Sequence, residues 1–569
     1  MKMLYKSMKY AVALIGAAVI SVGCEDFLTT NPSTDISDVD VEASTETLNM
    51  ALISAYSHFL FGYHTGDNGD RVYAGIPGFQ MYYDLRGTDI MCGNNMGGSQ
   101  CSSTQFTKDV TQTDGQYAKT FWIWGYKLIN LCNVIIDSCE TANGTEEDKA
   151  LLVGQAKTMR AVAYFHLILN YQNTYTLAGV PEKRGVILRL SKNDPESMPF
   201  STTEQVYQQI LKDLNDALVA LDGFDGGDAW KINTDVVNGY LARVNQCMGN
   251  WADAYKHANA VYSKYPTLMT EEQWTGGFDD QADVEEVFWS ITYDGDNNLG
   301  GGTQYNFWFN YDPGYGETAN DVHAVTGKQG IYKFMNFFAT PEYVALFDEN
   351  DYRGGKKLSA ADAEAQFKNG DAWDWDAYDA AVQDVNFWQR ALNTTEMLKH
   401  KWAYNKWKHY GNDAGQTLPT IPLMRSSEML LIMAEAVMNG AQADKTAKEL
   451  LNTLQEARGA VLTDVVDVDE IWKERRRELL GEGVTGMYDL LRLKKGITRK
   501  IESETNPSEW ILSNVQQFPD YSANVTEVSL PANDYRFICQ IPTLEFQEND
   551  AINIDTDQNP FGSDRVSAE

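Results

Sequence analysis

Basic residues are scarce in this sequence. It contains 46 Lys and Arg against 80 Asp and Glu, which gives a formal net charge of −34 at pH 7. A surface this acidic repels phosphate backbones and anionic lipid headgroups. We therefore expect no nucleic-acid partner and no electrostatic binding to a membrane surface. Polyanionic substrates are also disfavoured, unless a local basic pocket outweighs the average charge.

Cysteine is scarce as well. Apart from Cys24, six cysteines are spread too thinly to form a disulfide framework: Cys92, Cys101, Cys132, Cys139, Cys247 and Cys539. Cys132 and Cys139 lie about 10 Å apart along one predicted helix, too far for a disulfide. Cys92 and Cys101 flank a glycine-rich segment and could pair. We expect the others to fill the core.

The usual metal-binding patterns are missing too. No Cys/His spacing resembles a zinc site, so we expect no cofactor. The run Asp294–Asn298 offers oxygen ligands for Ca²⁺. A solvated turn is the better explanation of that run.

Only one apolar run suggests a membrane-related segment, and it lies near the N-terminus. Residues 11–20 are apolar, Lys2, Lys6 and Lys9 precede them, and small residues lead to Cys24. This pattern is typical of an export signal. The apolar stretch of about 12 residues spans roughly 18 Å as a helix, against roughly 30 Å for a bilayer core. It therefore cannot anchor the protein by itself.

The signal resembles that of bacterial lipoproteins, in which the cysteine after the cut is acylated. The resemblance implies a signal peptide over residues 1–23 and a lipid on Cys24, although Ser21 stands where leucine is usual. An ordinary signal peptide followed by an incidental cysteine is the alternative. The mature chain keeps 43 basic and 80 acidic residues, so its net charge is about −37.

Helical periodicity is what the sequence has in abundance. Apolar residues recur at steps of three and four, the period of an amphipathic helix. The predicted helices are Tyr117–Glu140, Glu147–Tyr171, a helix capped by Ser201 or Thr202 and stopped by Gly223, Thr234–Met248, Asn250–Lys264, Arg425–Asn439, Lys445–Arg458, Val468–Leu480 and Gly486–Leu493. Gly239, Ala242, Ala254 and Ala258 predict a close approach between two of them. Helix pairs of about 34 residues resemble tetratricopeptide repeats.

Residues 274–418 differ in character. Gly, Asp, Asn and aromatic residues dominate, and eight of the 14 tryptophans lie between residues 274 and 407. We expect short strands and long loops here, and long loops in a compact protein usually carry function. The predicted fold class is mostly α: tetratricopeptide-like helix pairs as a scaffold, with a loop-rich, aromatic-rich insert that contains short strands.

Charged residues gather between positions 474 and 492. We interpret this cluster as an ionic network that locks two helices together, since arginines and acids near a helix end pair readily. The run Gly481–Gly486 matches the spacing of a dinucleotide-binding glycine motif. It follows a predicted helix, not a strand, and Glu482 places an acid inside the phosphate cradle. We therefore reject dinucleotide binding.

Several segments, in order, resemble the SusD/RagB family of lipid-anchored nutrient-binding proteins. They are Cys24-Glu25-Asp26-Phe27-Leu28 with Asn31-Pro32, the helix Ala156–Phe165, the helix Arg425–Ala436, Glu474–Leu479 with Glu482-Gly483 and Asp489–Arg492, and Gln540-Ile541-Pro542 with Asn549. Each match is weak alone, but the order and spacing together are specific.

The resemblance implies a SusD-like fold and a non-catalytic role. It implies a protein on the cell-surface side of the outer membrane, held by its lipid, that binds a neutral glycan and delivers it to a SusC-like TonB-dependent transporter. The corresponding regions are a signal peptide (1–23), an N-terminal helical region (24–265), a ligand-binding insert (266–424) and a C-terminal helical region (425–569).

Neutral sugars need flat apolar faces for their C–H surfaces and planar polar groups for their hydroxyls. Two segments offer both. One is a loop cluster before the first strong helix: Tyr73, Tyr82, Tyr83, Asp84, Arg86, Asp89, Asn94 and Asn95. The other is the aromatic set of the insert: Trp274, Trp289, Tyr293, Tyr305, Trp308 and Tyr311. The candidate ligand-binding residues are Asp84, Arg86, Asn95, Trp289, Tyr293 and Trp308, and packing onto the core is the alternative for each.

Two other classes of protein remain open. A surface-anchored glycoside hydrolase needs two carboxylates about 5–9 Å apart, and the sequence singles out no such pair. A helical-repeat adaptor or RagB-like peptide-binding protein needs no clustered tryptophans. The catalytic motifs of nucleotide-dependent enzymes, zinc proteases and serine hydrolases are missing from the sequence.

Overall fold

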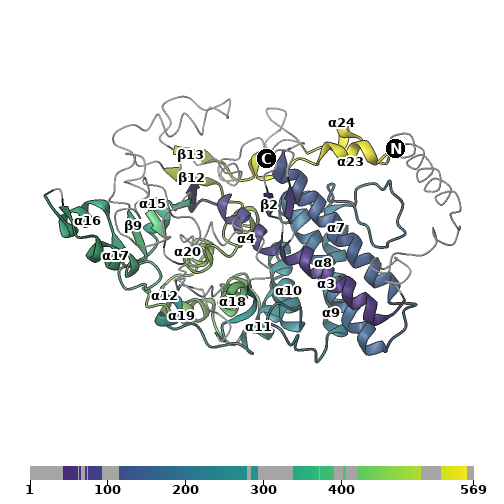
Figure 1. Ribbon diagram of the computed structural model, residues 1–569, viewed down its shortest axis with the longest axis horizontal. Coiled ribbons are helices and arrows are strands. Elements are labelled where there is room, and N and C mark those ends of the chain that lie inside the picture. The colour runs from purple at the N-terminus through teal and green to yellow at the C-terminus, as the bar shows by residue number, and fades with distance from the viewer. Residues whose placement is uncertain are drawn as a thin grey trace, which may run out of the picture.

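The computed structural model describes residues 43–61, 63–65, 71–73, 75–92, 115–277, 284–292, 337–370, 372–389, 402–404, 406, 420–500 and 527–559. Within these ranges the chain is mostly α-helical with short strands, as the sequence predicts (Figure 1). Cys24, the leader Thr29–Asp40 and Asp294–Asn298 lie outside them. The four cysteines Cys132, Cys139, Cys247 and Cys539 are free and buried, as expected of core residues.

The N-terminal helices pack mainly in chain order. They are α3 (Thr45–Phe61), α4 (Ile76–Leu85), α7 (Gln116–Ser138), α8 (Glu146–Tyr171), α9 (Thr203–Ala220), α10 (Thr234–Met248) and α11 (Trp251–Tyr262). α7 packs on α8, α8 on α9 and α10 on α11, and α3 contacts both α7 and α8 (Figure 1). The periodicity predicted α7 to α11 with ends displaced by two residues or fewer for most of them, whereas α3 and α4 were not expected.

Local sequence explains where these helices begin and end. The Thr202 side chain accepts a hydrogen bond from the Gln205 amide, and the Gln205 side chain accepts one from the Thr202 amide. This capping box starts α9. It gives hydrogen-bond acceptors to two backbone amides that have none within the helix. α10 ends at Gly249, whose φ of 75° lies in the left-handed region that glycine adopts without strain.

The C-terminal helices continue the same stack. They are α18 (Ser426–Met438), α19 (Ala447–Ala457), α20 (Val468–Leu479) and α21 (Met487–Arg492), close to their predicted bounds. α18 packs on α10 and α11 on one side and on α19 and α20 on the other. The helix is buried from Ser426 to Ala436, which explains its nearly continuous apolar sequence.

The described segments outside these helices include strands and short helices, most of them between the two helical groups. The strands are β1 (Tyr63–Thr65), β2 (Arg71–Tyr73), β3 (Ile90–Cys92), β4 (Val287–Thr292), β5 (Phe337–Ala339), β6 (Lys357–Leu358), β7 (Lys368–Asn369), β8 (Ala372–Trp373), β9 (Phe387–Gln389), β10 (Trp402–Tyr404), β11 (Thr420–Arg425), β12 (Ile497–Lys500) and β13 (Glu527–Leu530). The short helices are α12 (Glu271–Thr275), α15 (Pro341–Val344), α16 (Ala360–Phe367) and α17 (Trp375–Gln383).

These strands pair into small sheets. The largest has the order β3-β5-β10-β9-β6, in which only the β6–β9 pair is parallel. β4 pairs with β11, and Ile291 lies opposite Ile421. A Cβ on Gly239 would lie 2.6 Å from Met424 Sδ in β11. Gly239 therefore makes room for this two-stranded sheet, and the prediction that it serves the α10–α11 contact is wrong.

The last described segment of the chain forms hydrogen bonds with the end of α8. It contains a 3-10 turn (Tyr535–Phe537), α23 (Thr543–Glu548) and α24 (Ile554–Asp557). The Cys539 amide donates to the Asn170 carbonyl at 2.7 Å, and Asn559 Nδ2 donates to the Tyr171 carbonyl at 2.9 Å. These contacts bring the C-terminal segment against the N-terminal helices (Figure 1).

Candidate functional site

α4 occupies the place where the sequence predicts a ligand-binding loop cluster. All residues from Ile76 to Leu85 are buried, including Tyr82 and Tyr83. The Tyr83 hydroxyl lies 2.8 Å from His166 Nδ1 and accepts a hydrogen bond from Asn170. The loop prediction for this part is wrong, because Pro77 and Gly78 open a helix whose sides are all covered by protein.

Asp84 is held inside a ring of backbone amides. Its carboxylate accepts hydrogen bonds from the amides of Gly481, Gly483 and Gly486 at 2.7, 2.9 and 3.0 Å, and from the Thr485 hydroxyl at 3.2 Å. Burial raises the pKa of Asp84 to about 7, while these donors act to lower it. The glycine run rejected as a phosphate site thus surrounds a carboxyl group of the protein itself.

Arg86 and its neighbours also form hydrogen bonds and an ion pair with residues of the C-terminal region. Arg86 Nη2 donates to the Phe537 carbonyl at 2.6 Å. Arg499 donates to the carbonyl oxygens of Leu85 and Gly87, and Arg476 pairs with Asp89. The structure therefore assigns Asp84 and Arg86 a structural role in place of the predicted ligand contact, because both side chains are buried and engaged by protein atoms.

Trp274 and Trp289 are buried rather than displayed. Both rings are less than 3 % exposed. Trp289 Nε1 donates to the Trp230 carbonyl at 3.0 Å, and its ring packs between Phe59 and Tyr240. A sugar needs an open ring face, so the structure corrects the prediction that Trp289 stacks on ligand.

The remaining ligand candidates lie outside the described residues. They are Asn95, Tyr293 and Trp308, together with Asn94, Tyr305 and Tyr311. β3 ends at Cys92, three positions before Asn95, and β4 ends at Thr292, directly before Tyr293. The ends of β3 and β4 thus mark the points after which Asn95 and Tyr293 follow in the chain.

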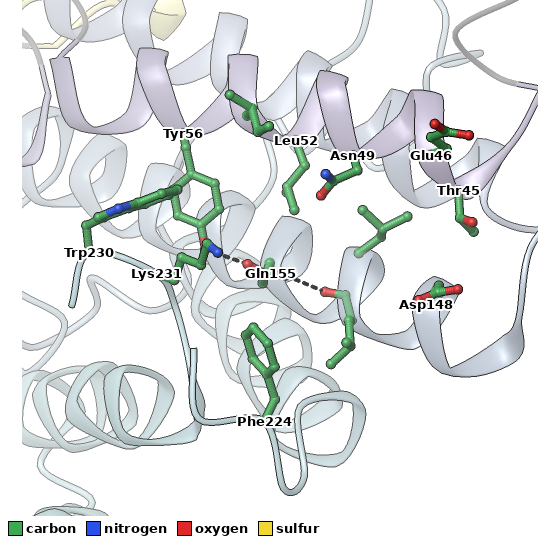
Figure 2. A pocket seen from close by; sticks show the side chains of 13 residues that line it. Thr45, Glu46, Asn49, Leu52, Tyr56, Asp148, Gln155, Phe224, Trp230 and Lys231 are labelled. Atoms are coloured by element: carbon green, nitrogen blue, oxygen red, sulfur yellow. Dashed lines mark hydrogen bonds between the residues drawn. The ribbon is translucent and has the colours of Figure 1, made fainter. Parts of the chain in front are cut away.

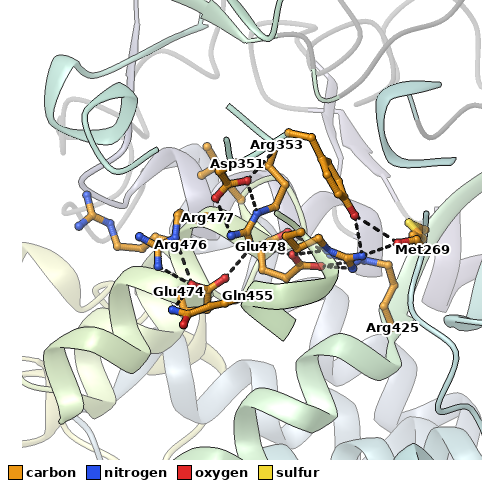
Figure 3. A network of polar contacts seen from close by, with 12 residues as sticks. Met269, Asp351, Arg353, Arg425, Gln455, Glu474, Arg476, Arg477 and Glu478 are labelled. Carbon is orange, nitrogen blue, oxygen red and sulfur yellow. Dashed lines mark hydrogen bonds and ion pairs between the residues drawn. The ribbon is translucent and has the colours of Figure 1, made fainter. Parts of the chain in front are cut away.

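The predicted ionic network exists and is larger than expected (Figure 3). Its centre is Glu478 on α20, which accepts hydrogen bonds from Arg353, Arg425 and Arg458 at 2.8–3.1 Å. Around it lie further fully or nearly fully buried partners: Glu286, Asp351, Lys406, Glu474 and Glu482. Trp274 lies within this cluster. The Lys406 Nζ atom and the Cζ atoms of Arg425 and Arg458 lie 5.0–5.1 Å from the centre of its ring.

This network joins the insert to the C-terminal helices. Glu286 precedes β4, Arg353 follows α15, Arg425 ends β11 and Arg458 caps α19. Burial acts to raise the pKa of Glu474. The guanidinium groups of Arg353 and Arg477 outweigh this effect and hold that pKa at about 2. The arginines likewise lower the pKa of Glu478 and Glu482 against the effect of burial, so these three acids are ionised at neutral pH and are not suited to act as general acids there.

A second group of ion pairs explains the helix motifs of the sequence. Glu428 on α18 forms a bidentate pair with Arg243 on α10, at 2.7 and 2.8 Å. Glu435, two turns later, pairs with Arg492, and Arg475 donates to Asp489 at 2.7 Å. These pairs lock α10, α18, α20 and α21 together, which confirms the interpretation of the 474–492 cluster as structural.

An open cavity of about 440 Å³ lies between α3, α8 and the segment that joins α9 to α10. Tyr56 and Trp230 stand at one end, Glu46 and Asp148 at the other, and Phe224 faces them from below (Figure 2). Sequence reasoning missed this site, because it did not predict α3. The spacing of Leu48, Leu52, Ala55 and Phe59 is the signal that could have revealed the helix.

Two family models match the chain in succession. The first, described as starch-binding and associating with the outer membrane, matches residues 74–244. The second, the SusD family, matches residues 285–561. The chain belongs to the SusD family. The two matched ranges together include α4, α18 and α20, and the second contains the cluster around Glu478.

Relatives agree with this assignment. The SusD-like protein P2 of Formosa agariphila is 26% identical over 412 residues, which cover 67% of this chain and 73% of the relative. A SusD-like carbohydrate-binding protein from Bacteroides vulgatus has a similar structure, with a TM-score of 0.68 at 21% identity; the match covers 92% of this chain and all of that one.

A further solved structure with this fold is the surface glycan-binding protein A of Bacteroides thetaiotaomicron in complex with laminarihexaose. Its TM-score is 0.61 at 17% identity, with 91% of this SusD-family chain and all of the other covered. Among the described residues, no helix is long and apolar enough to cross a membrane, and no cluster of His, Cys, Asp and Glu side chains could hold a metal ion.

Proposed function

We propose that this SusD-family protein is a cell-surface lipoprotein that binds a neutral oligosaccharide or polysaccharide and delivers it, without hydrolysis, to a SusC-like TonB-dependent transporter. The observation that carries the proposal is the succession of the two family matches, of which the first is described as starch-binding and outer-membrane-associated. The shared fold with a protein solved in complex with laminarihexaose supports a glycan as the ligand.

Charge supports a neutral glycan over an anionic one. The chain carries a net charge of −34, and repulsion would weaken the binding of sulfated or uronic-acid polymers. The proposed contacts are Asn95, Tyr293 and Trp308, since amides bind hydroxyls and aromatic rings stack on sugar faces. Binding needs no cofactor in this proposal, and Ca²⁺ at Asp294–Asn298 would be an addition to it.

Affinity electrophoresis tests this function. The soluble mature protein should be retarded in gels that contain a neutral polysaccharide, with starch and laminarin as the first two of a wider panel. Trp308→Ala should lower retardation several-fold, since one stacked ring contributes on the order of 1 kcal/mol. The matched control is Trp472→Ala, a half-buried tryptophan on α20. Release of reducing sugar from a retained polymer would contradict the non-catalytic proposal and favour a hydrolase.

The lipid anchor is tested in cells. Cys24→Ala removes the proposed acylation site and should abolish growth on the glycan, because a secreted receptor no longer stays beside its transporter. The same substitution should leave retardation of the purified protein unchanged, since Cys24 takes no part in the proposed contacts. Growth at the wild-type rate would show that the cysteine is incidental to an ordinary signal peptide.

A further inference from the structure

The cavity between α3 and α8 has a rigid aromatic end. The Tyr56 hydroxyl donates to Gln155 Oε1 at 2.8 Å and accepts from the Ile232 amide at 2.8 Å, so it has no need of a ligand partner. The Trp230 ring meets Tyr56 edge-on, with ring centroids 4.9 Å apart and an interplanar angle of 85° (Figure 2). The deep end is therefore apolar and already satisfied in its hydrogen bonds.

The backbone around Trp230 is held at three successive points. Ala229 and Trp230 offer their carbonyl oxygens to the Ser290 amide and to Trp289 Nε1, at 3.1 and 3.0 Å. The Ile232 amide donates to Tyr56 as above. Trp289, which the sequence suggested as a ligand contact, instead braces the tryptophan of this cavity. A ring fixed before binding loses little conformational entropy when a ligand stacks on it.

The rim is polar and carries both donors and acceptors. Glu46 and Asn49 lie one turn apart on α3, Asp148 lies on α8, and Lys231 follows Trp230. Glu46, Asn49 and Asp148 are exposed, and Trp230 and Phe224 are half-buried. An apolar floor with a hydroxyl-binding rim matches a sugar ring, which has C–H faces and a polar periphery.

Charge at the cavity disfavours anions throughout and disfavours cations at the aromatic end. Glu46 and Asp148 repel an anion, and the net charge of −34 adds to that repulsion. The Lys231 ammonium already lies 5.4 Å from the centre of the Trp230 ring and pairs with Asp228 at 2.9 Å, so a cationic ligand would compete with it. Glu46 and Asp148 lie at the opposite end of the cavity (Figure 2), so the aromatic end is the part that favours a neutral ligand.

We propose that this cavity is a second carbohydrate-binding site, which takes the neutral end of a short oligosaccharide and shares no residue with Asn95, Tyr293 and Trp308. Its volume of about 440 Å³ lies near the lower end of the range for small-molecule sites, roughly 300–1,000 Å³, which suits a short ligand rather than a long polymer.

Fluorine NMR of the mature protein labelled with 5-fluorotryptophan tests this site directly. Trp230→Phe identifies the Trp230 signal by its loss. The probes are the methyl glycosides of glucose, galactose, mannose and xylose, with glucose 6-phosphate and tetramethylammonium as charged counterparts. We expect at least one neutral glycoside to shift the Trp230 signal saturably, and neither charged probe to do so.

Variants make the test specific. Phe224→Ala should weaken the affinity reported by Trp230 about fivefold, since it removes one aromatic wall. Tyr255→Ala removes a half-buried aromatic ring on α11 and should leave that affinity unchanged. The proposal is overturned if none of the four glycosides shifts the Trp230 signal, or if a charged probe shifts it as strongly.

The result is separable from the proposed function. Trp308→Ala should leave the Trp230 titration unchanged while it lowers retardation in polysaccharide gels. A silent Trp230 signal in a protein that is still retarded by a polysaccharide overturns the second site alone. A saturable signal with no retardation in any gel overturns the proposed loop contacts and leaves the cavity as a sugar site.

Discussion

Replacement of Glu478 by glutamine should destabilise the protein by about 3–5 kcal/mol. Glu478 is fully buried and accepts charged hydrogen bonds from three arginines, Arg353, Arg425 and Arg458. An amide keeps the shape but removes the charge, and its NH₂ group cannot accept from a guanidinium. Each arginine would keep another buried acid as a partner, but the central carboxylate that all three share would be lost and their buried N–H groups towards it would be left without an acceptor. Urea unfolding followed by circular dichroism measures the loss.

An exposed ion pair serves as the control. Lys448 and Asp464 lie 3.1 Å apart, with 46% and 97% of their side chains exposed. Asp464→Asn should change the free energy of unfolding by less than about 1 kcal/mol, because water screens such pairs. Equal urea midpoints for Glu478→Gln, Asp464→Asn and the wild-type protein would contradict the importance of the buried cluster.

The same cluster predicts a loss of stability in acid. The pKa of Glu474 is about 2 in the folded protein, where Arg353 and Arg477 outweigh the effect of burial, and 4.5 is its ordinary value. A group whose pKa is lowered on folding stabilises the protein fully above its unfolded pKa. That stabilisation, roughly 3 kcal/mol, is lost as the pH falls from about 4.5 towards 2. Glu474→Gln should flatten the stability curve in that range.

Periodicity predicted the longer helices, including those with one buried and one exposed face. α9 and α19 are of this kind, and their caps also follow from sequence. α4 has no exposed face, so its sequence lacks the polar half of the pattern. α3 exposes apolar residues, Met50 and Ile53, on its outer side, which weakens the contrast between its faces. Both helices were missed for these reasons.

The binding residues were harder to predict because an aromatic side chain looks the same in sequence whether it is buried or exposed. Trp274 is covered by Arg425 and Arg458, which are more than 150 positions away in the chain. Trp289 is covered by Phe59 and Tyr240, which also come from distant elements. In contrast, the charged motifs were interpreted correctly, because buried arginines and acids need partners of opposite charge, whichever element supplies them.

The second large effect is expected where α4 meets the loop after α20. Gly483 has a φ of 75°, and a Cβ there would lie 2.2 Å from the Gln80 Cα. Gly179 has the same φ but nothing within 4 Å of its Cβ position. Gly483→Ala and Gly179→Ala therefore share the strain of a left-handed alanine, about 1–2 kcal/mol. Only Gly483→Ala adds a collision between backbones.

We expect Gly483→Ala to be less stable than Gly179→Ala by about 3 kcal/mol or more, because backbone atoms of α4 cannot move aside as a flexible side chain can. The displacement would also pull the Gly483 amide from the Asp84 carboxylate. Asp84→Asn keeps the close approach but turns an NH₂ group towards amide donors, so it should be destabilised without any clash. Thermal unfolding of the three variants separates these causes. Equal melting temperatures for the two glycine variants would show that the loop can move away from α4, and that the cradle does not fix α4 and the adjoining strand β3 in place.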